Sequence, residues 1–162
     1  MVEVFVSIGS NVEPERHVRF AVEALQQRFG ELRISTVYQT AAVGFDGDDF
    51  LNLVVGFRTR ESVEAVDQAL DGIERDGGRD QASPRFSPRT IDLDLLLYGD
   101  LVMDTPDLRL PRNEILKYAF VLAPLVELAA GRLHPETGRP LASHWQEFDK
   151  TGNELLAIDF HF

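Results

Sequence analysis

The order of the patterned segments in the first hundred residues constrains the fold of this chain more than any other feature. Strict apolar alternation predicts β-strands, whereas apolar residues three and four positions apart predict amphipathic helices. By these two patterns the expected strands span residues 2–8, 32–38, 50–59 and 91–98, and the expected helices span residues 14–29 and 62–75. The resulting β-α-β-β-α-β order is the split βαβ, or ferredoxin-like, arrangement of the α+β class. It predicts an antiparallel sheet with both helices on one face.

The rest of the chain predicts a C-terminal extension of helices and short strands. Short extended pieces are expected at residues 101–103 and 108–110, followed by helices over residues 118–130 and, with a weaker pattern, 140–147. These elements or a ligand would cover the second face of the sheet. A chain of 162 residues is long enough for one domain with its own core, so we expect a single domain over residues 1–162.

The charge and composition exclude several classes of function. The formal net charge is −11, and the only lysines are Lys117 and Lys150, which disfavours nucleic-acid binding. No apolar run reaches the length of a membrane span, and the N-terminus lacks the basic start of a signal peptide. The chain has no cysteine and therefore no disulfide framework. We expect a cytoplasmic protein, without nucleic-acid or membrane partners, in which an anionic substrate is bound by a local arginine cluster.

Two acidic residues in the fourth expected strand carry the strongest chemical signal. Asp92 and Asp94 are two positions apart, and residues i and i+2 of a strand project from the same face. By the same alternation, Leu96 and Tyr98 would share the face of the aspartates, and Leu97 would lie on the opposite face. Two carboxylates side by side on a half-buried strand need a compensating positive charge, and Mg²⁺ is commonly held by one or two carboxylates plus substrate phosphates. The alternative, a solvated acidic strand edge, is disfavoured by the apolar residues on both faces.

A long connection precedes this strand. Residues 76–88 contain two glycines and two prolines and predict a loop of about a dozen residues, a length typical of lids and binding loops. Arg85 and Arg89 lie at its end, where guanidinium groups would suit substrate phosphates. A surface turn set by Pro88 is the simpler reading of this segment taken alone.

Four short motifs resemble the 6-hydroxymethyl-7,8-dihydropterin pyrophosphokinase family. They are S-I-G-S-N at residues 7–11, Y-Q-T at 38–40, F-L-N at 50–52 and P-R-T-I-D-L-D at 88–94. The last is highly specific, and the spacing agrees from about residue 4 to residue 128. The resemblance implies a step of folate biosynthesis, in which the diphosphate of ATP moves to the hydroxymethyl group of the pterin and AMP is released.

The resemblance also implies roles for individual residues. Asp92 and Asp94 would bind two Mg²⁺ ions that bridge the ATP phosphates, and Arg79 and Arg89 would act in catalysis. The residues implied in ATP binding are Glu74, Arg79, Arg85, Arg89, Arg112 and Lys117. Those implied in pterin binding are Thr40, Ala41, Val43, Phe50, Asn52, Phe86 and Phe120.

Several positions depart from the family pattern. Phe86 stands where tryptophan is common, and Ala41 and Ala42 replace a common Pro-Pro. On the nucleotide side, Arg112 stands where histidine is frequent, and non-basic residues occupy three usually basic positions, namely Gln81, Asp107 and Tyr118. How ATP is held is therefore left open by the sequence.

Two other functions compete with the pterin pyrophosphokinase. One is Mg²⁺-dependent diphosphate transfer to another hydroxymethyl heterocycle, and the other is a non-catalytic ferredoxin-like module that binds nucleotide. A module that only binds has no need of two metal ligands beside a phosphate-binding arginine, which favours an enzyme, expected to be a monomer.

Overall fold

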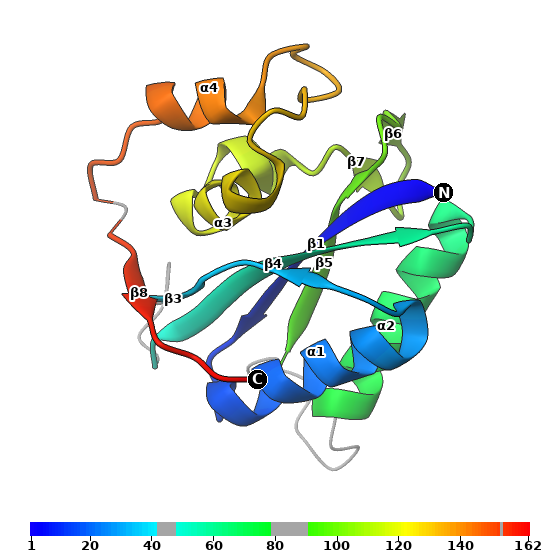
Figure 1. The fold of residues 1–162 in the computed structure, drawn as a ribbon, viewed down its shortest axis with the longest axis vertical. Helices are drawn as coiled ribbons and strands as arrows, with labels where there is room; N and C mark the ends of the chain where they lie inside the picture. Colours follow the sequence, from blue (N-terminus) through cyan, green and yellow to red (C-terminus); the bar gives the residue numbers. More distant parts are fainter. Residues whose placement is uncertain (42–47, 79–90, 153) are drawn as a thin grey trace.

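The protein is described by a computed structural model, which covers residues 1–41, 48–78, 91–152 and 154–162. Its centre is an antiparallel sheet with the strand order β5-β1-β4-β3-β8 (Figure 1). The strands are β1 (Val2–Ser10), β3 (Val37–Thr40), β4 (Phe50–Thr59), β5 (Asp92–Tyr98) and β8 (Leu156–Ile158), and the short β2 (Arg33–Ile34) also pairs with β4. The predicted α+β class and the ferredoxin-like strand order are confirmed.

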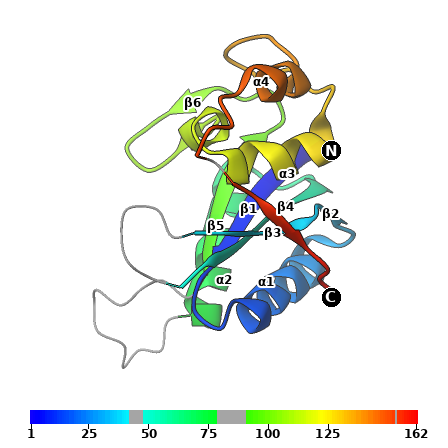
Figure 2. The same cartoon turned by 90° about the vertical axis from the view of Figure 1, so that its left-hand side faces the viewer.

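The sheet lies between two helical layers. Helices α1 (Pro14–Phe29) and α2 (Val63–Gly78) cover one face, and α3 (Ala119–Ala129) covers the other, with α4 (Leu141–Glu147) packed outside it (Figures 1 and 2). Each face has its own apolar core, because alternate residues of β1 point to opposite sides: Val4 and Val6 pack with α1 and α2, and Phe5 packs with α3. The C-terminal elements therefore cover much of the second face.

A 3₁₀ turn, η1 (Asn113–Leu116), leads into α3, and a separate hairpin of β6 (Met103–Asp104) and β7 (Arg109–Leu110) precedes it. These elements agree with the extension predicted from the sequence. None of the helices in the described parts of the chain combines the length and the apolar character that crossing a membrane requires.

The second predicted strand is broken, and one strand was missed. Residues 32–38 form β2 and β3 instead of one strand, and Ser35 between them accepts the Val54 N–H through its hydroxyl at 2.9 Å. The missed strand is β8, whose three residues are too few for a visible alternation. It pairs with β3 and extends the sheet beyond the four-stranded core.

A β-bulge in β5 changes which side chains share a face. Val6 pairs with Leu95 and Phe5 with Leu97, so Leu96 is the extra residue. Leu97 consequently packs in the core beside α3, whereas Tyr98 packs on the side of α1 and α2. The predicted faces of Leu97 and Tyr98 were therefore wrong. Asp92 and Asp94 precede the bulge and keep their common face.

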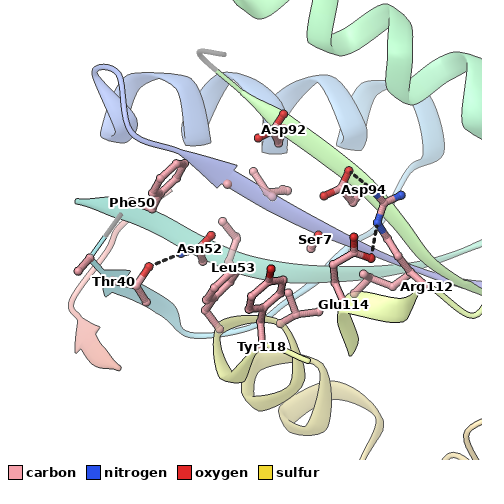
Figure 3. A pocket seen from close by; sticks show the side chains of 16 residues that line it. Ser7, Thr40, Phe50, Asn52, Leu53, Asp92, Asp94, Arg112, Glu114 and Tyr118 are labelled. Carbon is pink, nitrogen blue, oxygen red and sulfur yellow. Dashed lines mark hydrogen bonds and ion pairs between the residues drawn. The ribbon is translucent and has the colours of Figure 1, made fainter. Parts of the chain in front are cut away.

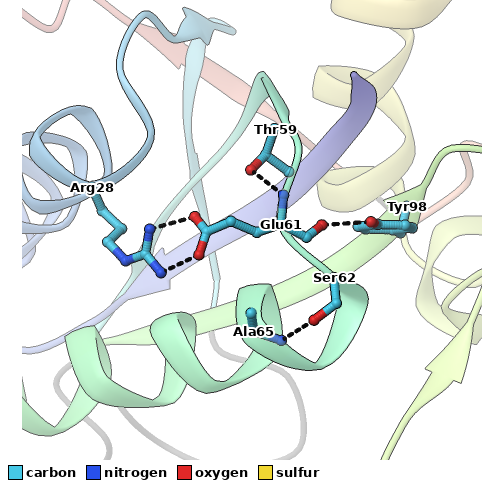
Figure 4. A network of polar contacts seen from close by, with 6 residues as sticks. All are labelled: Arg28, Thr59, Glu61, Ser62, Ala65 and Tyr98. Atoms are coloured by element: carbon cyan, nitrogen blue, oxygen red, sulfur yellow. Dashed lines mark hydrogen bonds and ion pairs between the residues drawn. The ribbon is translucent and has the colours of Figure 1, made fainter.

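A polar network joins three elements at the end of the sheet opposite the aspartates (Figure 4). Glu61, in the turn between β4 and α2, pairs through its carboxylate with Arg28 near the end of α1. The hydrogen bonds from Arg28 hold the pKa of Glu61 below its usual value. The Tyr98 hydroxyl donates to the Glu61 carbonyl at 2.6 Å, and the Ser62 hydroxyl accepts the Ala65 N–H at 3.2 Å, as expected of a helix N-cap.

Candidate active site

A cavity of about 270 Å³ lies between the sheet and the segment that runs from η1 into α3. Its floor consists of β1, β4 and β5, and its other wall is formed by Arg112, Glu114, Tyr118, Phe120 and Val121. Figure 3 shows Thr40, Phe50 and Asn52 at one end, and Asp94 with Arg112 and Glu114 at the other. The cavity thus connects an amide- and ring-lined end with an end that carries carboxylates.

The pairing of three strands aligns the floor of the cavity into rows. Gly9 of β1 pairs with Asn52 on one side and with Asp92 on the other. In the next row, Ser7 pairs with Asp94. A Cβ atom on Gly9 would lie 3.0 Å from the Asn52 amide oxygen, so the glycine leaves the space between Asn52 and Asp92 open.

Arg112, which directly precedes η1, and Glu114 within η1 face the aspartates. The Arg112 N–H donates to the Leu96 carbonyl at 3.1 Å, which ties this segment to the bulge of β5. Arg112 Nη2 lies 3.3 Å from Asp94 Oδ1, and Arg112 Nε lies 3.1 Å from Glu114 Oε2. A single guanidinium therefore contacts two carboxylates at this end of the cavity.

The opposite end combines a buried amide with aromatic rings. Asn52 is buried, and its Nδ2 donates to Thr40 Oγ1 at 2.7 Å. Tyr118 and Phe120 stack with their ring centroids 4.9 Å apart and their planes 16° apart, and Phe50 lines the same end. Aromatic faces and a fixed amide suit a flat heterocycle with polar edges.

Many of the residues predicted for the site lie together in this cavity. Its lining includes Thr40, Ala41, Phe50, Asn52, Asp92, Asp94, Arg112 and Phe120. Five further predicted residues lie outside the described part of the chain, namely Val43, Arg79, Arg85, Phe86 and Arg89.

The remaining two predicted residues are placed outside the lining. Glu74, near the end of α2, accepts the Leu93 N–H at 2.8 Å and so binds the outer edge of β5 between the two aspartates. The Lys117 ammonium lies over the Tyr118 ring, 5.3 Å from its centroid, beside a neighbouring depression that Lys117 and Tyr118 share.

Eight lining residues were not assigned to the site from the sequence. Four are aliphatic, namely Ile8, Leu53, Leu96 and Val121, and the others are Ser7, Gly9, Glu114 and Tyr118. Ser7 and Gly9 belong to the S-I-G-S-N motif, and their place opposite Asp94 and Asp92 depends on strand register. Tyr118 was noted only as a departure on the nucleotide side, although the Y-A-F spacing with Phe120 could have indicated a ring pair.

The charges around Arg112 are mostly negative. Burial raises the pKa of Asp67 on α2 above its usual value, the nearby Asp71 and Asp107 carboxylates add to the rise, and Arg112 opposes it. Arg112 thus lies within reach of a further carboxylate besides Asp94 and Glu114. Such a surrounding attracts cations and makes each arginine important for binding an anion.

The donor set fits a metal that is bound together with a phosphate substrate. Within residues 1–41, 48–78, 91–152 and 154–162, no three histidine, cysteine or acidic side chains form a group that could hold a metal ion. Two carboxylates from one strand face would supply only part of an octahedral shell, which is the usual arrangement when Mg²⁺ takes its other ligands from water and phosphates.

Comparisons with known proteins agree with this site. The model of the family described as 7,8-dihydro-6-hydroxymethylpterin-pyrophosphokinase (HPPK) matches residues 5–130. The chain belongs to this family. Among its relatives, the 2-amino-4-hydroxy-6-hydroxymethyldihydropteridine pyrophosphokinase of Aquifex aeolicus is 33% identical over 143 residues, which are 87% of this chain and 89% of that protein. The enzyme of the same name from Porphyromonas gingivalis is 36% identical over 86% of this chain and 99% of that protein.

Solved structures of HPPK proteins share the fold. The HPPK-DHPS of Plasmodium falciparum superposes with a TM-score of 0.71 at 10% identity, over 91% of this chain and 43% of that chain. The present chain thus spans less than half of that longer protein. HPPK enzymes are ATP-dependent and generally need Mg²⁺.

Proposed function

We propose that this chain carries out the reaction of its family, transfer of the diphosphate of ATP to 6-hydroxymethyl-7,8-dihydropterin. The hydroxymethyl oxygen attacks the β-phosphorus, the bond from that phosphorus to the oxygen bridging the α-phosphate breaks, and AMP leaves with the electron pair. The hydroxyl proton is released. The observation that supports this proposal most is the single cavity that joins a heterocycle-sized, ring-lined end to paired carboxylates.

The ring-lined end would bind the pterin. Asn52, held by Thr40, would read the polar edge of the heterocycle, and Phe50 and Phe120 would pack on its rings. Ala41 lines the same end, and Val43 and Phe86 are included on the strength of the family resemblance. The open space at Gly9 would let the hydroxymethyl group extend from Asn52 toward Asp92.

The carboxylate end would bind the reacting phosphates. Asp92 and Asp94 would hold two Mg²⁺ ions, which neutralise phosphate charge when they are bound. Because diphosphate transfer needs positioning and charge neutralisation more than a covalent nucleophile, the arginines of this chain carry the rest of the task. Arg112 would contact a phosphate, and Arg79 and Arg89 would support the transfer. The other residues that would bind the nucleotide are Glu74, Arg85 and Lys117.

Release of AMP from ATP, Mg²⁺ and hydroxymethyldihydropterin tests the assignment of the two aspartates. We expect Asp92→Asn and Asp94→Asn each to lower turnover by at least about 100-fold, the cost of removing one strong electrostatic contact to a reacting group. Asp100→Asn is the control, since this exposed carboxylate pairs with Arg132 away from the cavity. Failure of the native protein to release AMP would contradict the proposed reaction. Full activity in both aspartate variants would contradict the metal site.

The proposal extends to the form in which the enzyme works. Residues 1–162 would act as one domain and as a monomer in the cytoplasm, with ATP and the pterin as partners and without nucleic acid or membrane. The net charge of −11 and the absence of cysteine support this setting.

A further inference from the structure

Arg112 occupies an unusual position, because it contacts one of the proposed metal ligands directly. Its Nη2 atom lies 3.3 Å from Asp94 Oδ1, and about a third of its side chain is exposed, 32% against 39% for Asp94. A guanidinium and a metal ion at the same carboxylate repel each other and share its oxygen lone pairs, so each weakens the binding of the other. Metal binding at Asp94 is therefore opposed for as long as Arg112 keeps this contact.

Glu114 determines where the displaced guanidinium can go. Its carboxylate lies 3.1 Å from Arg112 Nε, on the stem side of the guanidinium, while the Nη2 end faces Asp94. The backbone of Arg112, the residue before η1, is tied to Leu96, and Ile115 within η1 is fully buried, so the segment that carries Arg112 and Glu114 is fixed. Nε is buried and makes no hydrogen bond within the described part of the chain, so the charge of Glu114 alone keeps the guanidinium near this position when its Nη2 end leaves Asp94 and turns to another anion in the same cavity.

We propose that Arg112 exchanges Asp94 for a nucleotide phosphate when the metal binds, and that Glu114 is the positioning residue for this exchange. The inference rests on the proposed function, because it takes Asp94 as a metal ligand and ATP as the anion. The exchange makes the binding of the metal and the binding of the nucleotide cooperative. Metal alone is opposed by Arg112, whereas metal with nucleotide gives Arg112 a new partner. The contact of Arg112 with Asp94, which opposes metal binding in the empty site, is thereby replaced in the loaded site by a contact with the nucleotide.

Binding of Mn²⁺ without nucleotide, followed by electron paramagnetic resonance of the free ion, tests the first half of the exchange. Arg112→Gln should bind Mn²⁺ about 2- to 5-fold more tightly than the native protein, the range expected for loss of a partly exposed ion pair. In the presence of α,β-methylene-ATP, which cannot be cleaved at the reacting bond, the same variant should bind the nucleotide more weakly. A variant that binds the metal more tightly and the nucleotide more weakly is not expected if Arg112 has only a structural role.

A double-mutant cycle tests Glu114. In Glu114→Gln the guanidinium loses the carboxylate that competes with Asp94 at close range, so Mn²⁺ should bind about 2- to 5-fold more weakly than to the native protein. If Glu114 acts through Arg112, this loss should disappear in the background of Arg112→Gln. If the loss persists there, Glu114 contributes only its charge to the site, and its role as a positioning residue is overturned.

Arg139 and Glu147 provide matched controls. They form a two-bonded arginine–glutamate pair on α4 and the turn before it, at 2.7 and 2.6 Å, and neither lines the cavity. Arg139→Gln and Glu147→Gln change the same charges and should leave Mn²⁺ affinity unchanged. An unchanged affinity in Arg112→Gln, with native-like melting, would overturn the exchange. If Asp94→Asn binds Mn²⁺ as well as the native protein, the metal site itself fails, which is a different outcome.

Discussion

Gly9 is the residue at which the two ends of the cavity meet. It lies between Asn52 and Asp92 in one cross-strand row, and both of these side chains line the cavity. Any side chain at this position would stand between the sites proposed for the heterocycle and for the phosphates. The absence of a Cβ atom is therefore a requirement of the site more than of the backbone, which here runs in a regular strand.

Replacing Gly9 by alanine tests this role. The added methyl group would lie 3.0 Å from the Asn52 amide oxygen, so we expect Asn52 to shift and the KM for the pterin to rise about 10-fold, equivalent to about 1.4 kcal/mol. The KM for ATP should change far less. Gly131→Ala is the control, since a Cβ atom there meets nothing within 4 Å. Equal effects on both substrates in steady-state kinetics would contradict the role assigned to Gly9.

Strand geometry alone predicts only those residues of the site whose neighbours are close in sequence, whereas Thr40, Asn52 and Phe120 were predicted through the family resemblance. Asp92 and Asp94 share a face because they are two positions apart, and this follows from strand geometry alone. Gly9 and Glu114 could not be assigned in this way. Their partners are Asn52 and Arg112, and the first contact depends on strand register while the second depends on how η1 docks on β5.

At the scale of elements, two irregularities in the sheet position the site, and neither has a sequence signal of its own. The bulge at Leu96 offers a carbonyl to Arg112, and β8 extends the sheet beside β3, the strand that ends at Thr40. Alternation predicted the regular parts of β1, β4 and β5. It failed at the bulge because one inserted residue reverses the face of every later side chain.

The C-terminal strand β8 is held in place by the residues that follow it. Phe160 packs against the core beneath α1, Arg19 lies over its ring at 4.7 Å, and Arg19 Nε donates to the His161 carbonyl at 3.1 Å. We expect Phe160→Ala to weaken this attachment by about 1–2 kcal/mol, somewhat less than the value for a fully buried side chain. Hydrogen exchange should then accelerate at Val37–Thr40, and the KM for the pterin should rise because Thr40 supports Asn52.

Phe162→Ala serves as the comparison for this change, since Phe162 is 52% exposed. Its effect on exchange in β3 should be much smaller. If exchange in β3 is as slow in Phe160→Ala as in the native protein, β8 does not depend on the tail.

At the scale of the whole molecule, the cavity exists because the sheet has two cores on opposite faces. The core with α1 and α2 follows from the ferredoxin-like order, and the sequence was sufficient to predict it. The second core, between the sheet and α3, is a contact between elements far apart in the chain, with Phe5 and Val54 packed against Leu122 and Leu125. Sequence patterns place α3 along the chain but do not specify this docking, and so they did not predict the cavity wall that Tyr118 and Phe120 form.

His134 makes the stability of this second layer dependent on pH. It is buried in the turn between α3 and α4, where its Nδ1 accepts the N–H groups of Glu136 and Thr137 at 3.2 and 3.3 Å. Burial, with a smaller contribution from the nearby His144, lowers the pKa of His134 below its usual value. A proton on Nδ1 would also break both hydrogen bonds. The folded protein therefore favours the neutral ring, whereas an unfolded chain protonates near pH 6.5.

The sign of the effect follows from proton binding. As the pH falls below about 6.5, the unfolded state takes up a proton that the folded state does not, so the free energy of unfolding falls by up to about 1.4 kcal/mol per pH unit until the folded pKa is reached. His134→Asn keeps an acceptor at the Nδ1 position but does not titrate, so its melting temperature should fall less between pH 7 and pH 5 than that of the native protein. His161→Asn, at a side chain 84% exposed, should follow the native curve. Parallel curves for the native protein and His134→Asn would show that protonation of His134 contributes nothing to the pH dependence of stability.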